Sequence, residues 1–283
     1  MLSALGIVIV IVAVFGGYWL ENGDLDVLLQ PAEFVIIWGA ALGSLVVATP
    51  LPVIRRVFSG VGKAFRADPY NKAFYLATLK LLFQLFHKGR MQGLVSLDSH
   101  VERPGQSDIF RSHKTVLANS WAIGFICDTL RFAVTGGVPA ADIDQMVETD
   151  LDVQAEHNRQ PVHSLTTIAD ALPGLGIVAA VMGIVITMGS LGGPPEELGE
   201  KVAAALVGTF LGVLTCYGFV SPLAEAMNAA DESEAAYLRA VKEGLIAFIK
   251  GHPPVVAMEF TRRAVPHDLR PTFSEMERRC LKS

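Results

Sequence analysis

The chain has 283 residues, of which 51% are hydrophobic and only 18% charged, and its formal net charge is −5. Soluble domains carry about a quarter charged residues, so this composition indicates a protein that lies in lipid. The basic residues are confined almost wholly to the ranges 55–159 and 239–282. This pattern excludes a nucleic-acid-binding protein with a basic face and a wholly soluble enzyme. The three scattered cysteines exclude a secreted disulfide scaffold.

Four apolar segments are each long enough to cross a bilayer as a helix. They cover residues 2–20, 34–53, 172–191 and 202–220. At about 1.5 Å per residue, a helix of roughly 20 residues spans the ~30 Å hydrocarbon core. A fifth apolar stretch, 116–134, contains Asn119, Asp128 and Arg131. Because a charge at mid-membrane costs about 2.5–3.5 kcal/mol, this stretch is predicted to be a buried helix of a soluble layer.

The charges between the spans predict their orientation. The loop 21–33 holds acidic residues and no basic one, and the loop 192–201 holds Lys201 as its single basic residue. The segments that follow the second and fourth spans are basic, which favours the cytoplasm for both. Both termini are therefore predicted to be cytoplasmic, and Glu33 is predicted to lie in an outer loop.

The cytoplasmic portion is predicted to be helical. Apolar residues at helical spacing mark a helix over 73–86, and Pro139 opens a helix rich in acidic residues. The fourth span is predicted to continue as one helix over 200–250 and to end at Gly251. The fold class is thus an all-α integral membrane protein, with four transmembrane helices and a helical cytoplasmic domain into which the third and fourth helices extend. The predicted parts are an N-terminal hairpin (1–54), a cytoplasmic helical domain (55–167), a core of spans three and four (168–222) and a cytoplasmic extension with the C-terminal tail (223–283).

The predicted spans contain no Asp, Glu, Lys, Arg or His. Proton movement across a bilayer usually needs an ionisable relay. If protons move here, a partner helix must therefore supply the carboxylate. The spans carry small and hydroxyl residues instead, and the pairs Gly39-x-x-x-Gly43 and Gly208-x-x-x-Gly212 allow two helices to approach closely.

Three stretches of the sequence resemble one protein family. The run 205–214 (Ala-Leu-Val-Gly-Thr-Phe-Leu-Gly-Val-Leu), followed after seven residues by Pro222, is similar to the signature of the flagellar motor stator A subunit (MotA) family. The run 173–183 resembles the third helix of that family, and the pattern over 90–110 resembles its cytoplasmic loop. The likeness covers nearly the whole chain. It also connects the chain to the broader MotA/TolQ/ExbB proton channel family.

This resemblance implies a stator subunit of the bacterial flagellar motor. Several copies, five in the family pattern, would surround two copies of a MotB-type subunit that brings an ionisable Asp and a domain anchored to peptidoglycan. The complex would conduct protons and turn the rotor. The implied residue roles are Thr209 and Ala180 on the ion pathway, Pro173 and Pro222 as hinges, and Arg90 and Asp98 at the interface with the rotor switch-ring protein FliG.

Several of these residues also have a purely structural explanation. Without the resemblance, Pro173 is a proline at the start of a helix and Pro222 a kink where a helix leaves the membrane. Arg90 and Asp98 are then solvated surface charges, and family members often carry Glu where this chain has Asp98. Sodium-driven relatives tend to carry a hydroxyl residue where this chain has Ala180, so protons are the expected coupling ion. The resemblance implies a multi-pass protein of the bacterial inner membrane, and no cofactor, metal, nucleic acid or enzymatic activity is expected.

Two rival functions stay open. A TolQ/ExbB-type proton-driven energiser of envelope proteins is one, although such proteins usually have three spans and lack the hairpin of spans one and two. A secondary transporter or passive channel is the other, although transporters show inverted repeats and helices broken at mid-membrane. An enzyme is disfavoured because the seven histidines are dispersed, without an H-x-x-x-H spacing.

Overall fold

The computed structural model describes residues 2–189 and 194–281, and every regular element in these two ranges is helical. The chain divides into two compact units, which are described separately. Unit 1 comprises the described residues of 1–67 and 157–230, and unit 2 those of 68–156 and 231–283. Helices α10 (Ala140–Met188) and α12 (Ser221–Ile249) contribute residues to both units. The predicted all-α fold class is confirmed, and the division of the chain into four parts stays a prediction.

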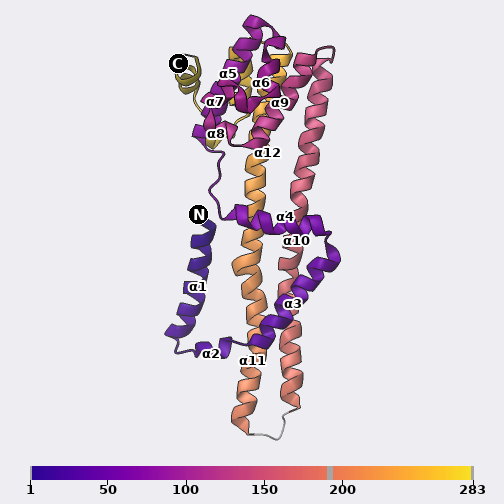
Figure 1. Ribbon diagram of the computed structural model, residues 1–283. Helices are drawn as coiled ribbons and strands as arrows, with labels where there is room; N and C mark the ends of the chain where they lie inside the picture. The colour runs from indigo at the N-terminus through magenta and orange to yellow at the C-terminus, as the bar shows by residue number, and fades with distance from the viewer. Residues whose placement is uncertain (1, 190–193, 282–283) are drawn as a thin grey trace. The chain divides into compact units, whose positions relative to one another are not determined.

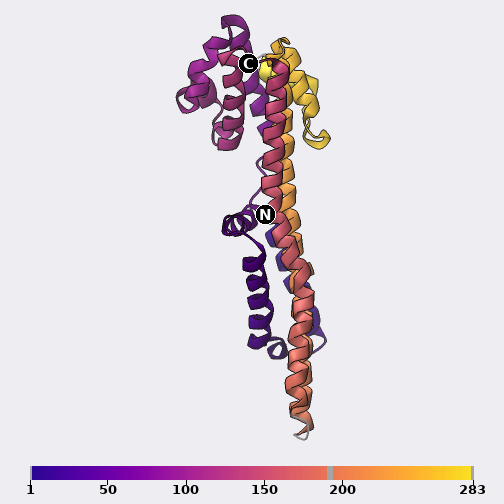
Figure 2. The same ribbon diagram turned by 90° about the vertical axis from the view of Figure 1, so that its right-hand side faces the viewer.

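Unit 1 contains the N-terminal helices, the second part of α10, and a helix that passes through a π-helical segment into α12 (Figure 1). Its remaining elements are α1 (Leu2–Leu20), α2 (Leu25–Leu28), α3 (Pro31–Ala48), α4 (Leu51–Ala64), α11 (Pro195–Leu214) and the π-helix η3 (Thr215–Val220). In both views α10 lies beside α11 (Figure 2).

Unit 2 contains the first part of α10, most of α12 and a set of shorter helices. These are α5 (Lys72–Gln92), η1 (Leu94–Leu97), α6 (Asp98–Glu102), η2 (Pro104–Gln106), α7 (Asp108–Ser112), α8 (Lys114–Leu117), α9 (Ser120–Thr135), α13 (Pro254–Ala264), η4 (His267–Leu269), α14 (Phe273–Met276) and the π-helix η5 (Glu277–Leu281).

Four helices of the described residues are long and apolar enough to cross a membrane, as predicted. They are Leu2–Leu20, Leu25–Ala48, Ala140–Met188 and Lys201–Ile249. The first coincides with the predicted span, and the last confirms the continuous helix predicted over 200–250. The end of the predicted third span, residues 190 and 191, lies outside the described residues. The stretch 116–134 is not among the four.

The second span begins and ends earlier than predicted, because α3 covers Pro31–Ala48 and not 34–53. Pro31 occupies the first turn of α3, where its fixed φ suits the helix and its missing N–H costs nothing. Pro50 lies after the end of α3 with an extended backbone, at ψ 143°, and becomes the N-cap of the next helix. Residues 51–53 therefore belong to α4.

The core of unit 1 forms where α3 crosses the pair α10 and α11. Ile37, Ala41 and Leu45 recur every fourth residue along α3, and all three are buried. Ile37 and Ala41 belong to one cluster with Leu172 of α10 and Leu211 of α11. Helix α1 has no buried residue, so most of its apolar side chains are not covered by the described part of this chain.

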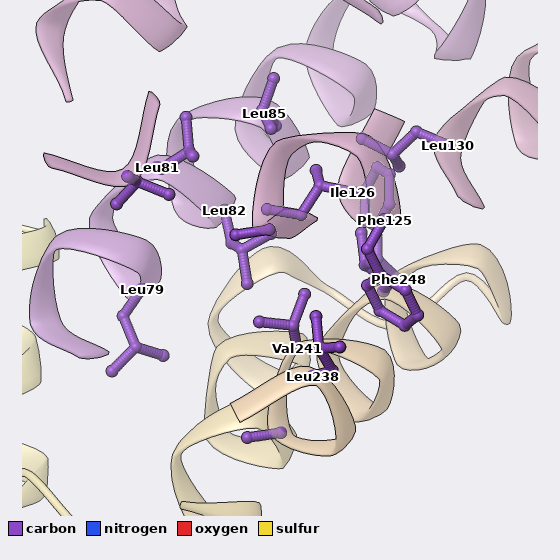
Figure 3. Close-up of a cluster of buried hydrophobic side chains, with 14 of the residues drawn as sticks. Leu79, Leu81, Leu82, Leu85, Phe125, Ile126, Leu130, Leu238, Val241 and Phe248 are labelled. Carbon is purple, nitrogen blue, oxygen red and sulfur yellow. The ribbon is translucent and has the colours of Figure 1, made fainter. Parts of the chain in front are cut away.

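The core of unit 2 forms where α5, α9 and α12 converge (Figure 3). Leu82 of α5 and Ile126 of α9 are fully buried there, and the ring of Phe86 stacks on Phe248 with centroids 4.5 Å apart. Tyr237 is also fully buried, and its hydroxyl shares a 3.0 Å hydrogen bond with a threonine on α5. Burial raises the pKa of the Tyr237 phenol, which keeps it protonated. Helix α9 thus belongs to a protein core, as the charges of stretch 116–134 predicted.

Gly251 ends α12, as the sequence predicted. Its φ of +90° is a left-handed conformation that glycine adopts without strain. The N–H of His252 donates to the Ala247 carbonyl at 3.1 Å, and the N–H of Gly251 donates to the Phe248 carbonyl at 2.9 Å. These two bonds form a Schellman cap, which satisfies the last carbonyls of the helix.

Candidate functional site

Helices α10 and α11 meet along a seam of small residues. A Cβ placed on Gly212 would lie 2.6 Å from the Leu172 carbonyl oxygen and 2.8 Å from the Cα of Gly176. One placed on Gly183 would lie 2.8 Å from the Cβ of Ala205. The two backbones therefore pack so closely that the seam accepts no larger side chain at these glycines.

Only one of the two predicted glycine pairs makes such a contact within the chain. The prediction is confirmed for Gly208 and Gly212, which face α10. Among the described residues, a Cβ on Gly39 or Gly43 would meet nothing within 4 Å, so for this pair the close approach stays a prediction. Close approach needs small residues on both helices, and α10 supplies them in register with α11.

The structure brings Ala180, one of the two predicted ion-pathway positions, to this seam, and Thr209 directly follows a residue of the seam. Gly208, which directly precedes Thr209, faces the backbone N of Ala180, at 3.0 Å from a Cβ built on the glycine. Ala180 is buried, whereas Thr209 is half-buried. Within the described residues the Thr209 hydroxyl has no hydrogen-bond partner, although Thr187 on α10 donates to the Gly183 carbonyl at 2.8 Å. The Thr209 hydroxyl is therefore available to a group outside this chain.

The prediction that the spans hold no ionisable residue is wrong for the second span, because the helix of this span contains Glu33. Glu33 lies in the first turn of α3 and not in a loop, and only 7% of it is exposed. Its Oε2 would be 2.6 Å from a Cβ on Gly208. The sequence prediction missed it because span two was started at Phe34, after the last charge. The sequence feature that could have revealed Glu33 is Pro31. Proline favours the first position of a helix, and a helix that starts at Pro31 includes Glu33.

The two predicted hinge prolines lie in continuous helix, and a third proline accompanies them. Helix α10 passes through both Pro161 and Pro173. A proline inside a helix leaves the carbonyl four residues earlier without its N–H donor. At Pro161 the freed His157 carbonyl accepts a hydrogen bond from Arg56 Nη1 at 2.7 Å, and Arg56 Nη2 donates to Gln160 Oε1 at 2.9 Å. Arg56 thus connects α4 to α10 at Pro161 by two hydrogen bonds. The sequence analysis did not predict this contact.

In the described part of the chain, the backbone around the other two prolines has no such clamp. For Pro173 the freed carbonyl is that of Ala169, and no side chain of the described residues donates to it. Pro222 is exposed and follows directly on Ser221, at the end of the π-helix η3. π-Helical segments replace the usual hydrogen bonds with wider ones and often mark places where a helix bends. The hinge roles of Pro173 and Pro222 stay predictions.

Arg90 and Asp98 lie close together in sequence on unit 2. Arg90 is in the last turn of α5, and Asp98 begins α6 after the short helix η1. Both are exposed, and neither has an ion pair or side-chain hydrogen bond among the described residues. Other charges of unit 2 are paired, for example Lys242 with Asp144 at 2.8 Å. Arg90 and Asp98 are thus free to meet charges of another protein, and their role at the rotor stays a prediction.

Comparison with known protein families and structures gives consistent matches along the chain. The family described as "Motility protein A N-terminal" matches residues 4–93, and the "MotA/TolQ/ExbB proton channel family" matches residues 120–240. Motility protein A of Escherichia coli is 39% identical over 98% of this chain and 94% of its own length. Chemotaxis protein LafT of Vibrio parahaemolyticus is 36% identical over 98% of both chains.

Solved structures share the fold. A chain of the C. jejuni MotAB structure matches with a TM-score of 0.80 at 17% identity, covering 96% of this chain and 98% of that one. A chain of the flagellar MotAB stator complex from Bacillus subtilis matches with a TM-score of 0.71 at 22% identity, covering 91% and 92%. With four candidate spans, whole-length relatives and this shared fold, the chain belongs to the motility protein A (MotA) family of the MotA/TolQ/ExbB proton channels.

Proposed function

We propose that this chain is the A-type stator subunit of the bacterial flagellar motor, a multi-pass protein of the inner membrane that conducts protons and generates torque together with a MotB-type subunit. The observation that carries the proposal is the whole-length relationship to Motility protein A of E. coli. The Thr209 hydroxyl, which has no partner among the described residues, supports it, because a partner helix can bind there. Its chemistry is proton movement and not covalent catalysis.

The assembly we propose has five copies of this chain around a MotB-type dimer that is anchored to peptidoglycan. Both termini lie in the cytoplasm, where FliG of the rotor meets Arg90 and Asp98. An exposed ion pair contributes roughly 0–1 kcal/mol and is screened by salt. Contacts of that strength suit a motor, because they form and release repeatedly.

The coupling step we propose takes place beside Thr209. A proton reaches the partner's carboxylate there and neutralises it, which changes the packing that the α10–α11 seam prefers around the partner helix. One charge that crosses 100 mV supplies about 2.3 kcal/mol, which is enough to shift a two-state equilibrium substantially. Pro173 and Pro222 let the cytoplasmic parts of α10 and α12 move in response.

The related TolQ/ExbB-type energiser is not favoured, because the N-terminal family that matches residues 4–93 is that of motility protein A. A secondary transporter is not favoured either. The helices of the described residues have their membrane prolines near span ends, whereas transporter binding sites use helices broken at mid-membrane.

Expression of the chain with and without a MotB-type partner, in a strain that lacks both subunits, tests the proposal. We expect swimming in soft agar and proton influx only when both are present, since the seam offers a hydroxyl but the partner brings the essential carboxylate. Proton influx is measured with a cytoplasmic pH reporter. Conduction by the chain alone, or no swimming with both subunits, would contradict the proposed function.

Charge reversal at Arg90 and Asp98 tests the rotor contact. We expect Arg90→Ala or Asp98→Asn to lower torque partly, because each removes one weak contact, and Arg90→Glu with Asp98→Lys to lower it much further, because both contacts become repulsive. Torque is measured from the rotation of tethered cells. The reversal of Asp108, an exposed acid of the same unit, serves as control. Normal rotation after reversal of both Arg90 and Asp98 would remove them from the interface.

A further inference from the structure

Glu33 Oε2 is the one buried side-chain nitrogen or oxygen, among the described residues, that has no hydrogen-bond partner. Native proteins rarely leave such an atom unpaired, because a buried carboxylate without a donor loses its hydration and gains nothing in return. An exception within a membrane-spanning helix is a strong pointer to function, since ionisable groups at such positions usually take part in ion transfer.

The close contact of this carboxyl with α11 depends on Gly208, which has no side chain. A Cβ at that position would lie 2.6 Å from Glu33 Oε2, 3.0 Å from the Ala180 nitrogen and 3.2 Å from the Ala179 side chain. The carboxyl of α3 therefore reaches the α10–α11 seam at the residue that precedes Thr209. The sequence predicted no polar group at this point apart from that threonine.

Few other charges are near enough in the chain to pair with Glu33. On α2 the charged residue is Asp26, which repels a second carboxylate. Helix α10 has no titratable side chain over 171–188, and α11 has none over 202–214, after Lys201. Against these two stretches Glu33 is therefore the one titratable group beside Gly208, whereas Asp170 and Cys216 flank the other end of the seam, next to Leu172 and Gly212.

Glu33 lies in the first turn of α3, an 18-residue helix, and its carboxyl is enclosed against α11. A carboxyl group takes up and releases protons, which a purely structural contact at this point does not need.

We infer that Glu33 is a proton-binding site of this chain, which receives protons from the outer side and passes them toward the carboxylate that the partner holds beside Thr209. In the first step an O–H bond of hydronium breaks and an O–H bond forms on Glu33, leaving water. In the second step the Glu33 O–H bond breaks and one forms on the partner's carboxylate. No electron is transferred. The inference rests on the proposed function and adds a titratable group of the A-type chain to it.

Glu33→Gln tests this inference, because the amide keeps the size of the side chain and cannot bind and release a proton. Co-expressed with the MotB-type partner, the variant is expected to assemble as the wild type does while proton influx falls by about tenfold or more, as for a broken relay. Glu33→Asp keeps a carboxyl on a shorter stem and is expected to conduct partially, with a displaced dependence on external pH. Glu21→Gln, at an exposed acid outside the helices, is the matched control and should conduct normally.

The outcomes separate this inference from the proposed function. If the wild-type pair does not drive swimming, the proposed function fails. If the wild-type pair swims and Glu33→Gln conducts equally well, only the inference is overturned. Should Glu33→Gln not assemble with the partner, Glu33→Asp decides: a displaced pH profile of influx supports proton binding at Glu33, and an unchanged profile overturns it.

Discussion

Replacement of Gly208 by valine is expected to abolish both swimming and proton influx. Even a single Cβ at this position would lie 2.6 Å from Glu33 Oε2 and 3.0 Å from the backbone nitrogen of Ala180, so valine must push α3 and α10 away from α11. Overpacking of a close contact typically costs about 1–3 kcal/mol, and more where the obstacle is backbone that cannot turn aside. The displaced helices would also move Thr209 away from the partner. Soft-agar swimming and co-purification of the MotB-type subunit measure the effect.

Gly43→Val is the matched control, because a Cβ at Gly43 meets nothing within 4 Å among the residues that the structure describes. We expect this variant to accumulate in the membrane and to bind the partner normally. Gly208→Ala should lie between the two, since its methyl group needs a smaller displacement. Normal swimming of Gly208→Val would mean that the α10–α11 seam does not carry the ion path.

Much of the fold could be predicted from hydropathy and charge, because lipid imposes strong rules on a helix that crosses it. The first span was predictable from its uninterrupted apolar run alone. The end of α12 at Gly251 was predictable from a glycine that precedes two prolines. The error at span two has a local cause. A hydropathy window stops at the last charge, whereas Pro31 starts the helix before it.

The candidate site was less predictable, because it depends on which faces of the helices meet. Gly39 with Gly43 and Gly208 with Gly212 have the same spacing, yet only the second pair finds glycine and alanine opposite it on α10. Sequence spacing describes one helix at a time and contains no information on its neighbour. The burial of Glu33 escaped prediction for the same reason, since it is created by the absence of a side chain at Gly208 on a distant helix.

Phe86→Ala is expected to remove about 3–5 kcal/mol from the stability of unit 2, the usual cost when a fully buried phenyl ring becomes a cavity. The ring stacks on Phe248, so α5 and α12 lose their closest aromatic contact together. Arg90 follows one turn later on α5, and the loss of packing therefore also loosens the residue that we propose at the rotor interface. Denaturant unfolding and limited proteolysis of the full chain in lipid nanodiscs measure the loss, and torque is expected to fall with it.

The membrane helices provide an internal control for this variant, because Phe86 belongs to the core of unit 2 and not to that of unit 1. Membrane insertion should therefore be unaffected, which cell fractionation can verify. Phe273→Ala is the matched substitution: its ring is 49% exposed, so its loss leaves no cavity and should change stability little. Equal stability of the two variants would show that the stack of Phe86 on Phe248 does not hold α5 to α12. The position of Arg90 would then depend on the packing of the other buried residues of α5, of which Leu82 and Leu85 are fully buried.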